Sequence, residues 1–206
     1  MVPGPRVGSR SVTERAASPV GVPADAVLPP RHLDAPAPGE QIASHYHLCV
    51  GCGHDHPTGL RMVVTAGEGL TLSGRFTVTE NHQGAPGLAH GGMLALAFDE
   101  VLGSLIWLVA TPAVTGHLET DFRRPVPVGT TLHITAQVDG RFGRKLYVSA
   151  VGRSDAPDGP VAVRARAVFV MVEVEHFRRH GRPQDVQAAV TRDDVRYAAR
   201  ALEVNP

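Results

Sequence analysis

The densest group of chemically informative residues lies in segment 81–100, which reads NHQGAPGLAHGGMLALAFDE. A loop rich in Gly and Pro leads there into His90, Gly91 and Gly92, and an apolar run follows. Two glycines at the start of a helix leave its unpaired backbone N–H groups open to a ligand, at the positive end of the helix dipole. The pattern predicts an oxyanion hole, a set of donors that polarises a carbonyl and stabilises the charge developing on its oxygen.

Asp99 is the carboxylate that such a site needs, because a carboxylate can activate water as a base or attack a carbonyl directly. Both roles stay open. It follows His90 by nine residues, which on a helix is about 13 Å along the axis and roughly on the opposite side. One chain therefore cannot aim both groups at one carbon. Two such helices packed antiparallel about a two-fold axis would bring them together, so the spacing predicts a homodimer with two equivalent sites.

Each of these residues also has a purely structural interpretation. Asp99 is flanked by Ala97, Phe98 and Val101, and it would then pair with an arginine; we favour the functional role because an unpaired buried charge is costly without a purpose. For His90 the alternative is a helix cap or a packing contact. We expect the neighbouring Glu100 to be an ordinary solvated or salt-bridged residue.

The elements that must position these groups can be predicted from hydrophobic periodicity. Segment 91–110 is too long for an ordinary strand and predicts a helix with one apolar side formed by Leu94, Ala97, Val101, Leu105 and Leu108. β-Branched and alternating apolar residues predict strands over 60–66, 70–80, 114–125, 131–140, 144–153 and 161–174. The first two form a hairpin turned at 67–69, and the last four are expected to form an antiparallel meander.

The apolar helix is nearly long enough to cross a bilayer. Asp99 and Glu100 at its centre make that costly, and no second span exists in the sequence, so we expect no membrane span. A helix that is apolar all round is better explained by a curved antiparallel sheet wrapped around it, an α+β fold. We expect three parts: a Pro/Ala-rich arm over 1–40, disordered or wrapping; a folded domain over 41–174; and a polar extension over 175–206 that contains a short helix.

Composition excludes some classes of partner. Lys and Arg total 20 and Asp and Glu total 20, so the broad positive field that non-specific nucleic-acid binding needs is missing, and we expect no nucleic-acid partner. The only two cysteines, Cys49 and Cys52, are too close in sequence to staple a fold and are typical of a reducing compartment or a metal site. We therefore expect a cytoplasmic protein.

A metal site is the main competing interpretation. Six soft ligands lie within twelve residues, and Cys-x-x-Cys is half of a structural zinc site; the six are His45, His47, Cys49, Cys52, His54 and His56. No second Cys pair exists, and ligands this close in sequence strain a tetrahedral cage, so we expect no metal and no cofactor. A redox dithiol would need a thioredoxin-like βαβ context, which the predicted meander does not offer.

The order of these motifs resembles that of a known family. The segments HQGAPGLAHGG and LETDFRRPVPVG, with Asp99 between them, resemble the phenylacetate-type and human-type members of the hotdog acyl-CoA thioesterase superfamily. The matching positions are His90, Gly91, Gly92, Asp99, Thr115, Arg124 and Pro125. The upstream CVGCGHDHPTGL is similar to the family's Cys-x-x-Cys-Gly leader, except that His56 stands where the family has Asn. The resemblance covers roughly residues 45–173.

The resemblance implies a hotdog fold and hydrolysis of an acyl-CoA thioester. It implies that Asp99 is the catalytic carboxylate, that His90 and Gly92 orient and polarise the thioester, and that Thr115 positions the water or the carboxylate. It implies that acyl-CoA binds to a homodimer or to a dimer of dimers. Two alternatives remain, a hotdog dehydratase and a non-catalytic acyl-CoA-binding dimer.

Coenzyme A carries several phosphate charges, and a site for it needs Arg or Lys on its rim. The candidates for contacts with CoA are Arg123, Arg124, Arg141, Arg144 and Lys145 around two strand turns, with Gln83 and Gly84 in the loop before His90.

Overall fold

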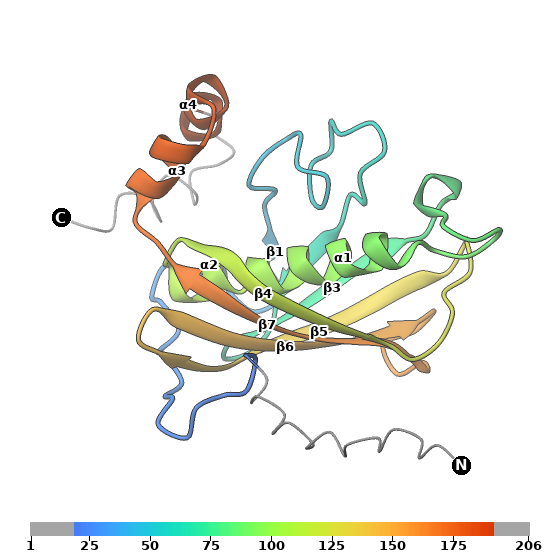
Figure 1. Ribbon diagram of the computed structural model, residues 1–206, viewed down its shortest axis with the longest axis horizontal. Coiled ribbons are helices and arrows are strands. Elements are labelled where there is room, and N and C mark those ends of the chain that lie inside the picture. The colour runs from blue at the N-terminus through green and yellow to red at the C-terminus, as the bar shows by residue number, and fades with distance from the viewer. Residues whose placement is uncertain (1–18, 192–206) are drawn as a thin grey trace, which may run out of the picture.

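A computed structural model describes residues 19–191 of the chain, with side chains up to residue 187. One antiparallel sheet surrounds a central helix (Figure 1). The elements are β1 (Gln41–Ile42), β2 (Val63–Ala66), β3 (Thr71–Thr77), η1 (Glu80–His82), α1 (Gly91–Ser104), α2 (Ile106–Val109), β4 (Ala113–Phe122), β5 (Thr131–Phe142), β6 (Lys145–Ser154), β7 (Val161–Met171), α3 (Val174–His180) and α4 (Pro183–Thr191).

The strands follow the order β1-β2-β3-β5-β6-β7-β4 in one seven-stranded sheet. The expected four-strand meander is wrong in one respect: β5, β6 and β7 are consecutive neighbours, but β4 pairs with β7 at the far edge and not with β5. The physical reason is the helix. Because α1 carries the chain across the concave face, β4 enters the sheet on the side opposite β3, and β5 then returns to pair with β3.

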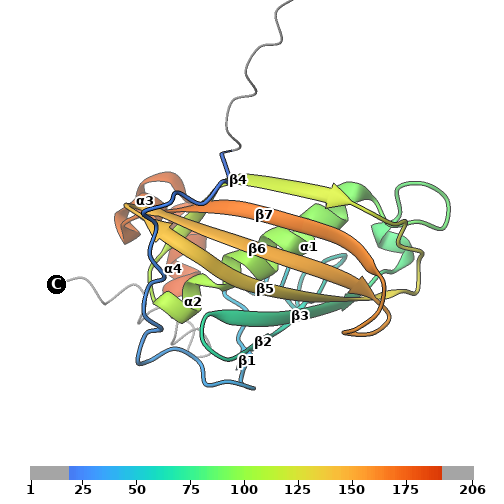
Figure 2. The same ribbon diagram turned by 90° about the horizontal axis from the view of Figure 1, so that it is seen from below.

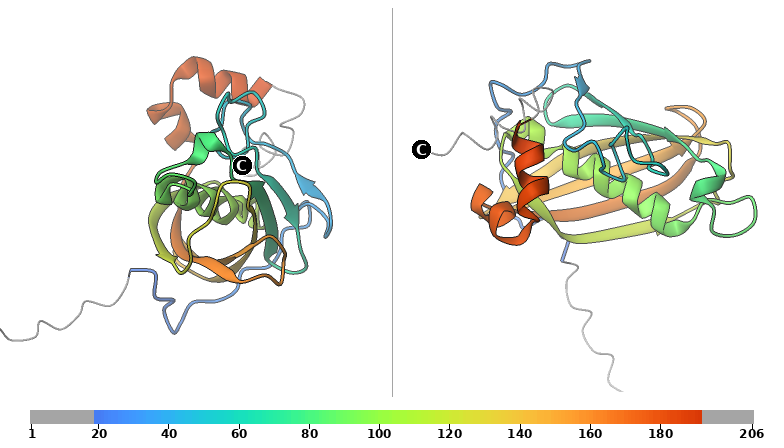
Figure 3. Two further views of the ribbon diagram at one scale, coloured as in Figure 1. Left: turned by 90° about the vertical axis from the view of Figure 1, so that its right-hand side faces the viewer. Right: turned by 90° about the horizontal axis from the view of Figure 1, so that it is seen from above.

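The sheet curls around α1, as the end-on view shows (Figure 3, left). Phe98, Val101 and Leu102 are completely buried on the side of the helix that faces the sheet. Two strand glycines allow this close approach: a Cβ atom on Gly152 would lie 2.8 Å from the Phe98 ring, and one on Gly74 would lie 2.4 Å from Val101. The predicted architecture, a curved antiparallel sheet around one long helix, is confirmed.

The predicted helix over 91–110 forms as two consecutive pieces, α1 and α2, joined at Leu105. Residues 91–109 have the length and composition of a membrane-crossing helix. In this structure, however, α1 packs against β3, β4, β5, β6 and β7. Its apolar character is thus accounted for by contacts with the sheet.

The described part of the N-terminal arm, residues 19–40, runs over the outer face of the sheet (Figure 2). Val20 is buried against Tyr147 and Val168, and Val27 pairs with Arg141. Arg31 donates hydrogen bonds to the carbonyl oxygens of Gly67, Gly69 and Pro36. This portion of the arm therefore wraps the domain. The C-terminal extension, which was expected to contain a short helix, carries α3 and α4, and residues 192–206 lie outside the described part of the chain.

Packing between α1 and the sheet gives a stability prediction. Replacing Phe98 with Ala leaves a cavity beneath the helix, so Phe98→Ala should lower the free energy of unfolding by about 3–5 kcal/mol. Phe142→Ala is the matched control, because the Phe142 side chain is 46% exposed at the end of β5; it should lower the same quantity by less than about 1 kcal/mol. Chemical denaturation followed by circular dichroism measures both. Equal losses in the two variants would contradict this account of the core.

Candidate active site

Asp99 and Thr115 meet at the edge of the sheet. Asp99 lies in the third turn of α1, and Thr115 lies in the edge strand β4. The Thr115 hydroxyl donates a hydrogen bond to Asp99 Oδ1 at 2.8 Å. This contact joins residues 16 positions apart and fixes the carboxylate, leaving Oδ2 available to a ligand or a water. The structure thus brings together two residues that the resemblance assigned to one site.

The Asp99 carboxylate is half-buried, and burial raises its pKa above the ordinary value for an aspartate. The hydrogen bond from Thr115 opposes that rise, and the charge of Cys49 adds to it. A carboxylate with a raised pKa is a stronger base than a solvated one. Asp99 is therefore suited to take a proton from water, and direct attack by the carboxylate is compatible with the same position.

The N-terminus of α1 carries the second half of the predicted chemistry. His90 is the N-cap, and its Nδ1 accepts a hydrogen bond from the Gly92 N–H at 2.9 Å. The Met93 and Leu94 amides donate to the His90 carbonyl oxygen. Among the described residues, the Gly91 N–H has no protein acceptor. The structure therefore selects Gly91 over Gly92 as the donor that can face a ligand, and it gives His90 the capping contact.

The loop before α1 is held by a histidine that the sequence analysis did not single out. His82 in η1 is buried, its Nδ1 accepts a hydrogen bond from the Thr79 N–H, and its carbonyl oxygen accepts one from the His90 N–H at 2.7 Å. Gly84 lies against His90, where a Cβ would approach the His90 Cα to 2.9 Å. The residues around His82 in the sequence are polar and do not indicate that its side chain is buried. The burial depends on packing of His82 against Phe76.

The two halves lie apart within one chain. Gly91 is next to Phe122, whose ring would lie 3.5 Å from a Cβ on that glycine. Asp99 is next to Thr115, seven residues earlier on the same strand. At about 3.4 Å per residue, the Cα atoms of Thr115 and Phe122 are about 24 Å apart along β4. The structure therefore agrees with the helical spacing: Gly91 and Asp99 of one chain do not share a single carbonyl.

The predicted phosphate-binding residues fall into two separate groups. Arg123 and Arg124 line an open hollow of about 540 Å³ together with Val161 and Arg164. Arg144 and Lys145 lie at the opposite end of the sheet, since Lys145 pairs with Val170 whereas the Arg123 end adjoins Val163. The two strand turns that carry the candidates thus lie at opposite ends of the sheet. Arg164 joins the first group because its strand partner Asp121 is two residues before Arg123, a non-local pairing that the sequence pattern alone does not specify.

Gln83 and Gly84, the other candidate contacts for CoA, lie on the exposed loop before α1. The Gln83 carboxamide oxygen accepts a hydrogen bond from the Gly87 N–H at 2.7 Å, so this side chain closes the loop on itself. Its amide nitrogen faces the Glu80 carbonyl oxygen at 3.4 Å. The structure consequently gives Gln83 a role in shaping the loop.

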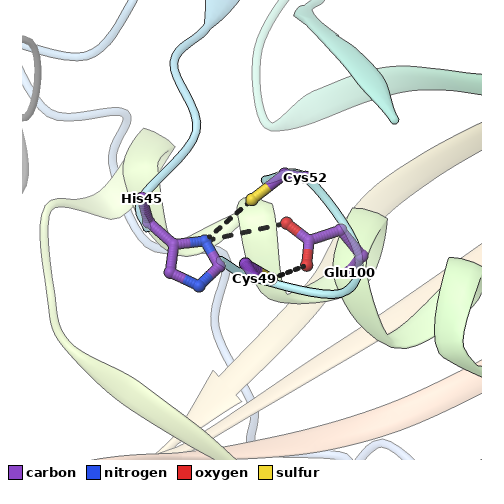
Figure 4. Close-up of side chains that lie close together, drawn as sticks. All are labelled: His45, Cys49, Cys52 and Glu100. Atoms are coloured by element: carbon purple, nitrogen blue, oxygen red, sulfur yellow. Dashed lines mark hydrogen bonds and ion pairs between the residues drawn. The ribbon is translucent and has the colours of Figure 1, made fainter. Parts of the chain in front are cut away.

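A second cluster of reactive side chains gathers around Glu100, the residue that follows Asp99 on α1 (Figure 4). His45, Cys49 and Cys52 of the leader, residues 43–60, converge on Glu100. The Cys49 thiol donates to Glu100 Oε2 at 3.3 Å, Cys52 Sγ lies 3.2 Å from His45 Nδ1, and that nitrogen lies 3.7 Å from Glu100 Oε1. Glu100 is only 10% exposed and forms an ion pair with His45, so the expectation of a solvated residue is wrong and the salt-bridged alternative is confirmed.

The groups of this cluster shift one another's pKa values. The hydrogen bond between the two cysteines lowers the pKa of Cys49 and raises that of Cys52. Burial raises the pKa of Glu100 to about 7, against the attraction of His45. Burial acts to lower the pKa of His45, but the hydrogen bond with Cys49 and the charge of Glu100 raise it overall. Four mutually dependent groups are thus packed into one small volume.

Comparisons with known proteins show similarity to thioesterases. A family model described as thioesterase superfamily matches residues 86–159, which contain His90, Gly91, Asp99 and Thr115. The chain is 36% identical to acyl-coenzyme A thioesterase THEM4 of Bos taurus over 93 residues, 45% of this chain and 38% of that protein. It is 32% identical to acyl-coenzyme A thioesterase THEM5 of Mus musculus over 45% of this chain and 37% of that protein. The matched region therefore spans less than two fifths of these relatives.

Solved structures match over a longer part of the chain. A crystal structure of a thioesterase superfamily protein superposes with a TM-score of 0.56 and 28% identity, covering 66% of this chain and 70% of that one. The PaaI protein of E. coli, from the phenylacetic acid degradation operon, superposes with a TM-score of 0.51 and 20% identity, over 55% of this chain and 80% of that one, which supports the fold alone. The chain thus has the hotdog fold, and its residues 86–159 are similar in sequence to the thioesterase superfamily.

Proposed function

We propose that the protein hydrolyses acyl-CoA thioesters to the free acid and coenzyme A. The observation that carries the proposal is the half-buried Asp99 carboxylate, oriented by Thr115 on the central helix, in a chain whose helix N-terminus offers an unpaired Gly91 amide. The relatives named acyl-coenzyme A thioesterases support this choice of substrate class. A binding module needs no base fixed in this way, and a hotdog dehydratase, which also needs a base, pairs an Asp with a His, whereas here His90 caps α1 nine residues before Asp99.

In the proposed reaction, the thioester carbonyl oxygen accepts a hydrogen bond from the Gly91 N–H, and the positive end of the α1 dipole favours the charge that develops there. Asp99 takes a proton from a water molecule as that water attacks the carbonyl carbon. The tetrahedral intermediate collapses, the C–S bond breaks, and CoA leaves as a thiolate that is then protonated. If Asp99 attacks instead, a mixed anhydride forms, and water hydrolyses it in a second step.

The site is completed by a second subunit in this proposal. Strand β4 is the edge of the sheet, and among the described strands none pairs with its outer side. A ten-residue edge with exposed Thr115, Gly116 and His117 is a template for pairing with another strand. If two copies of β4 pair antiparallel about their middle, the Phe122 end of one lies opposite the Thr115 end of the other. Gly91 of the partner subunit then lies near Asp99.

The hollow formed by Arg123, Arg124 and Arg164 is the proposed site for the phosphate groups of CoA. It lies at the Phe122 end of β4, the end that also carries Gly91. The guanidinium groups are exposed at its rim, although Arg123 is paired with Asp121. The acyl-CoA would therefore place its phosphates on the subunit that supplies the amide donor, and its thioester would reach across to the Asp99 of the other subunit.

Loss of the carboxylate should abolish most of the activity. We expect Asp99→Asn to lower kcat for a cleaved acyl-CoA by about 10²-fold or more, because the amide cannot accept the proton of water. Glu68→Gln, the same chemical change on the exposed β2–β3 turn, should leave kcat unchanged. Thiol release measured with a chromogenic disulfide across a panel of acyl-CoAs checks both. Full activity in Asp99→Asn would reject the mechanism, and tight CoA binding without any thiol release by the wild type would favour a binding module.

A complementation experiment tests the shared site. Gly91→Pro removes the unpaired N–H at a position where helices accept proline, so it should lower kcat by about 10²-fold while α1 stays folded. Randomly reassorted dimers of Gly91→Pro and Asp99→Asn chains should regain about a quarter of the wild-type activity, because each mixed dimer holds one intact site. Each variant alone should stay inactive. No recovery in demonstrably mixed dimers would show that both groups act within one chain.

Loss of an arginine from the hollow should weaken the binding of acyl-CoA without slowing the chemical step. Arg124→Ala should raise KM for acyl-CoA about tenfold with little change in kcat, since a lost charge-assisted contact far from the reacting carbon weakens ground and transition states alike. Arg75→Ala removes an exposed arginine on β3 and should leave both constants unchanged. Steady-state kinetics at two salt concentrations provide the measurement. A fall in kcat at constant KM would place Arg124 elsewhere in the reaction.

A further inference from the structure

We propose that His45, Cys49, Cys52 and Glu100 bind a zinc ion that fastens the leader to the central helix. This site is separate from the Asp99 chemistry, and the proposal does not depend on the thioesterase activity. Cys-x-x-Cys supplies only two ligands, which is why the sequence alone argues against a metal. The structure supplies the missing ligand from a distant element, because Glu100 of α1 lies 51 residues beyond Cys49 in sequence and within hydrogen-bond distance of it in space.

The distances suit tetrahedral zinc. With Zn–S of about 2.3 Å and Zn–N or Zn–O of about 2.0–2.2 Å, neighbouring ligand atoms of a tetrahedral site lie about 3.3–3.8 Å apart. Cys52 Sγ lies 3.2 Å from His45 Nδ1, Cys49 Sγ lies 3.3 Å from Glu100 Oε2, and His45 Nδ1 lies 3.7 Å from Glu100 Oε1. All four ligand atoms lie within 4.8 Å of one another, so an ion needs only small side-chain adjustments to enter.

The donor set also selects zinc by its chemistry. Zinc prefers thiolate and imidazole ligands, whereas Mg²⁺ and Ca²⁺ prefer shells made only of oxygen atoms. A carboxylate is an accepted fourth ligand of zinc. The buried Glu100 lies between a thiol and an imidazole and makes no contact with Lys or Arg within the described residues that would compensate its charge. A divalent cation at the centre of the four groups would provide that compensation.

Neighbouring groups donate hydrogen bonds to both sulfur atoms of the cluster, as they do around the ligands of a metal site. The Gly51 N–H donates to Cys49 Sγ at 3.3 Å, and the Ser44 hydroxyl donates to Cys52 Sγ at 3.4 Å. Hydrogen bonds of this kind orient ligating sulfur atoms and stabilise their charge. Gly51 is required by the close packing, because a Cβ there would lie 2.2 Å from Glu100 Oε2.

Three further histidines of the leader do not join the cluster. His54 is exposed, and His56 Nδ1 accepts a hydrogen bond from the Thr58 N–H at 3.3 Å. His47 is packed edge-on against Tyr46, and its Nδ1 is buried without a partner among the described residues. The selection of one histidine out of four near the two cysteines gives a matched control, since His45 and His54 differ in position and not in chemistry.

The experiment measures metal in the full-length chain. The protein is produced in zinc-supplemented medium, freed of any affinity tag and purified under reducing conditions without chelator. Metal analysis should find about one zinc per chain in the wild type and in His54→Ala. It should find less than about a tenth of that in the double variant Cys49→Ser with Cys52→Ser, and an at least tenfold weaker affinity for zinc in His45→Ala. Wild-type protein without zinc, or equal zinc in the double variant, would overturn the proposal.

Two further measurements keep the test decisive if a variant fails to fold. Co²⁺ added to the zinc-stripped wild type should give the visible absorption of a tetrahedral complex and a thiolate charge-transfer band, and one equivalent of Zn²⁺ should remove both. Hydrogen exchange of residues 43–60 should slow at least tenfold on zinc binding, because the ion ties the leader to α1. Three results would each count against the site: a Cys49–Cys52 disulfide that is present under reducing conditions, an octahedral cobalt spectrum, or a rate of hydrogen exchange in residues 43–60 that zinc does not change.

Discussion

Packing of the apolar helix α1 into the concave face of the sheet is the interaction on which the other features depend. Phe98, Val101 and Leu102 are removed from water completely, and Gly74 and Gly152 let the helix approach the strands closely. Because successive helical residues point about 100° apart, fixing Phe98 toward the core also fixes the directions of the two acids that follow it. Asp99 is directed to the β4 edge and Glu100 to the leader. One packing contact thus orients two different chemical centres.

The sequence predicts those features that depend on local periodicity. The long helix, the β2–β3 hairpin and the alternation in β5 and β7 follow from patterns within a few residues, and the structure confirms them. The place of β4 could not be predicted in the same way, because strand order is a non-local property and adjacent patterns say nothing about which strands pair. The arrival of Arg164 beside Arg124 follows from that unpredicted arrangement. The burial of Glu100 depends on another non-local contact, that of α1 with the leader.

The edge position of β4 also explains why the candidate site is incomplete in a single chain. Thr115 on this strand orients Asp99, while the other end of the strand lies beside the unpaired amide of Gly91. A strand whose outer side is unpaired tends to acquire a partner, and pairing with its own copy reverses its direction. In the proposed dimer, the same unpaired edge would bring Gly91 of one subunit and Asp99 of the other together.

The proximity of Asp99 to the His45–Cys49–Cys52–Glu100 cluster has an electrostatic consequence. Asp99 is half-buried, and the charge of Cys49 adds to the rise in its pKa. In the absence of a cation, a deprotonated cluster would repel the negative charge of Asp99 through a region that water screens poorly. A zinc ion compensates two negative charges among its ligands, so burial and the Thr115 hydrogen bond would then dominate the environment of Asp99. The metal would in this way hold the leader in place. It would also reduce the effect that the charge of the cluster around Glu100 has on the pKa of Asp99.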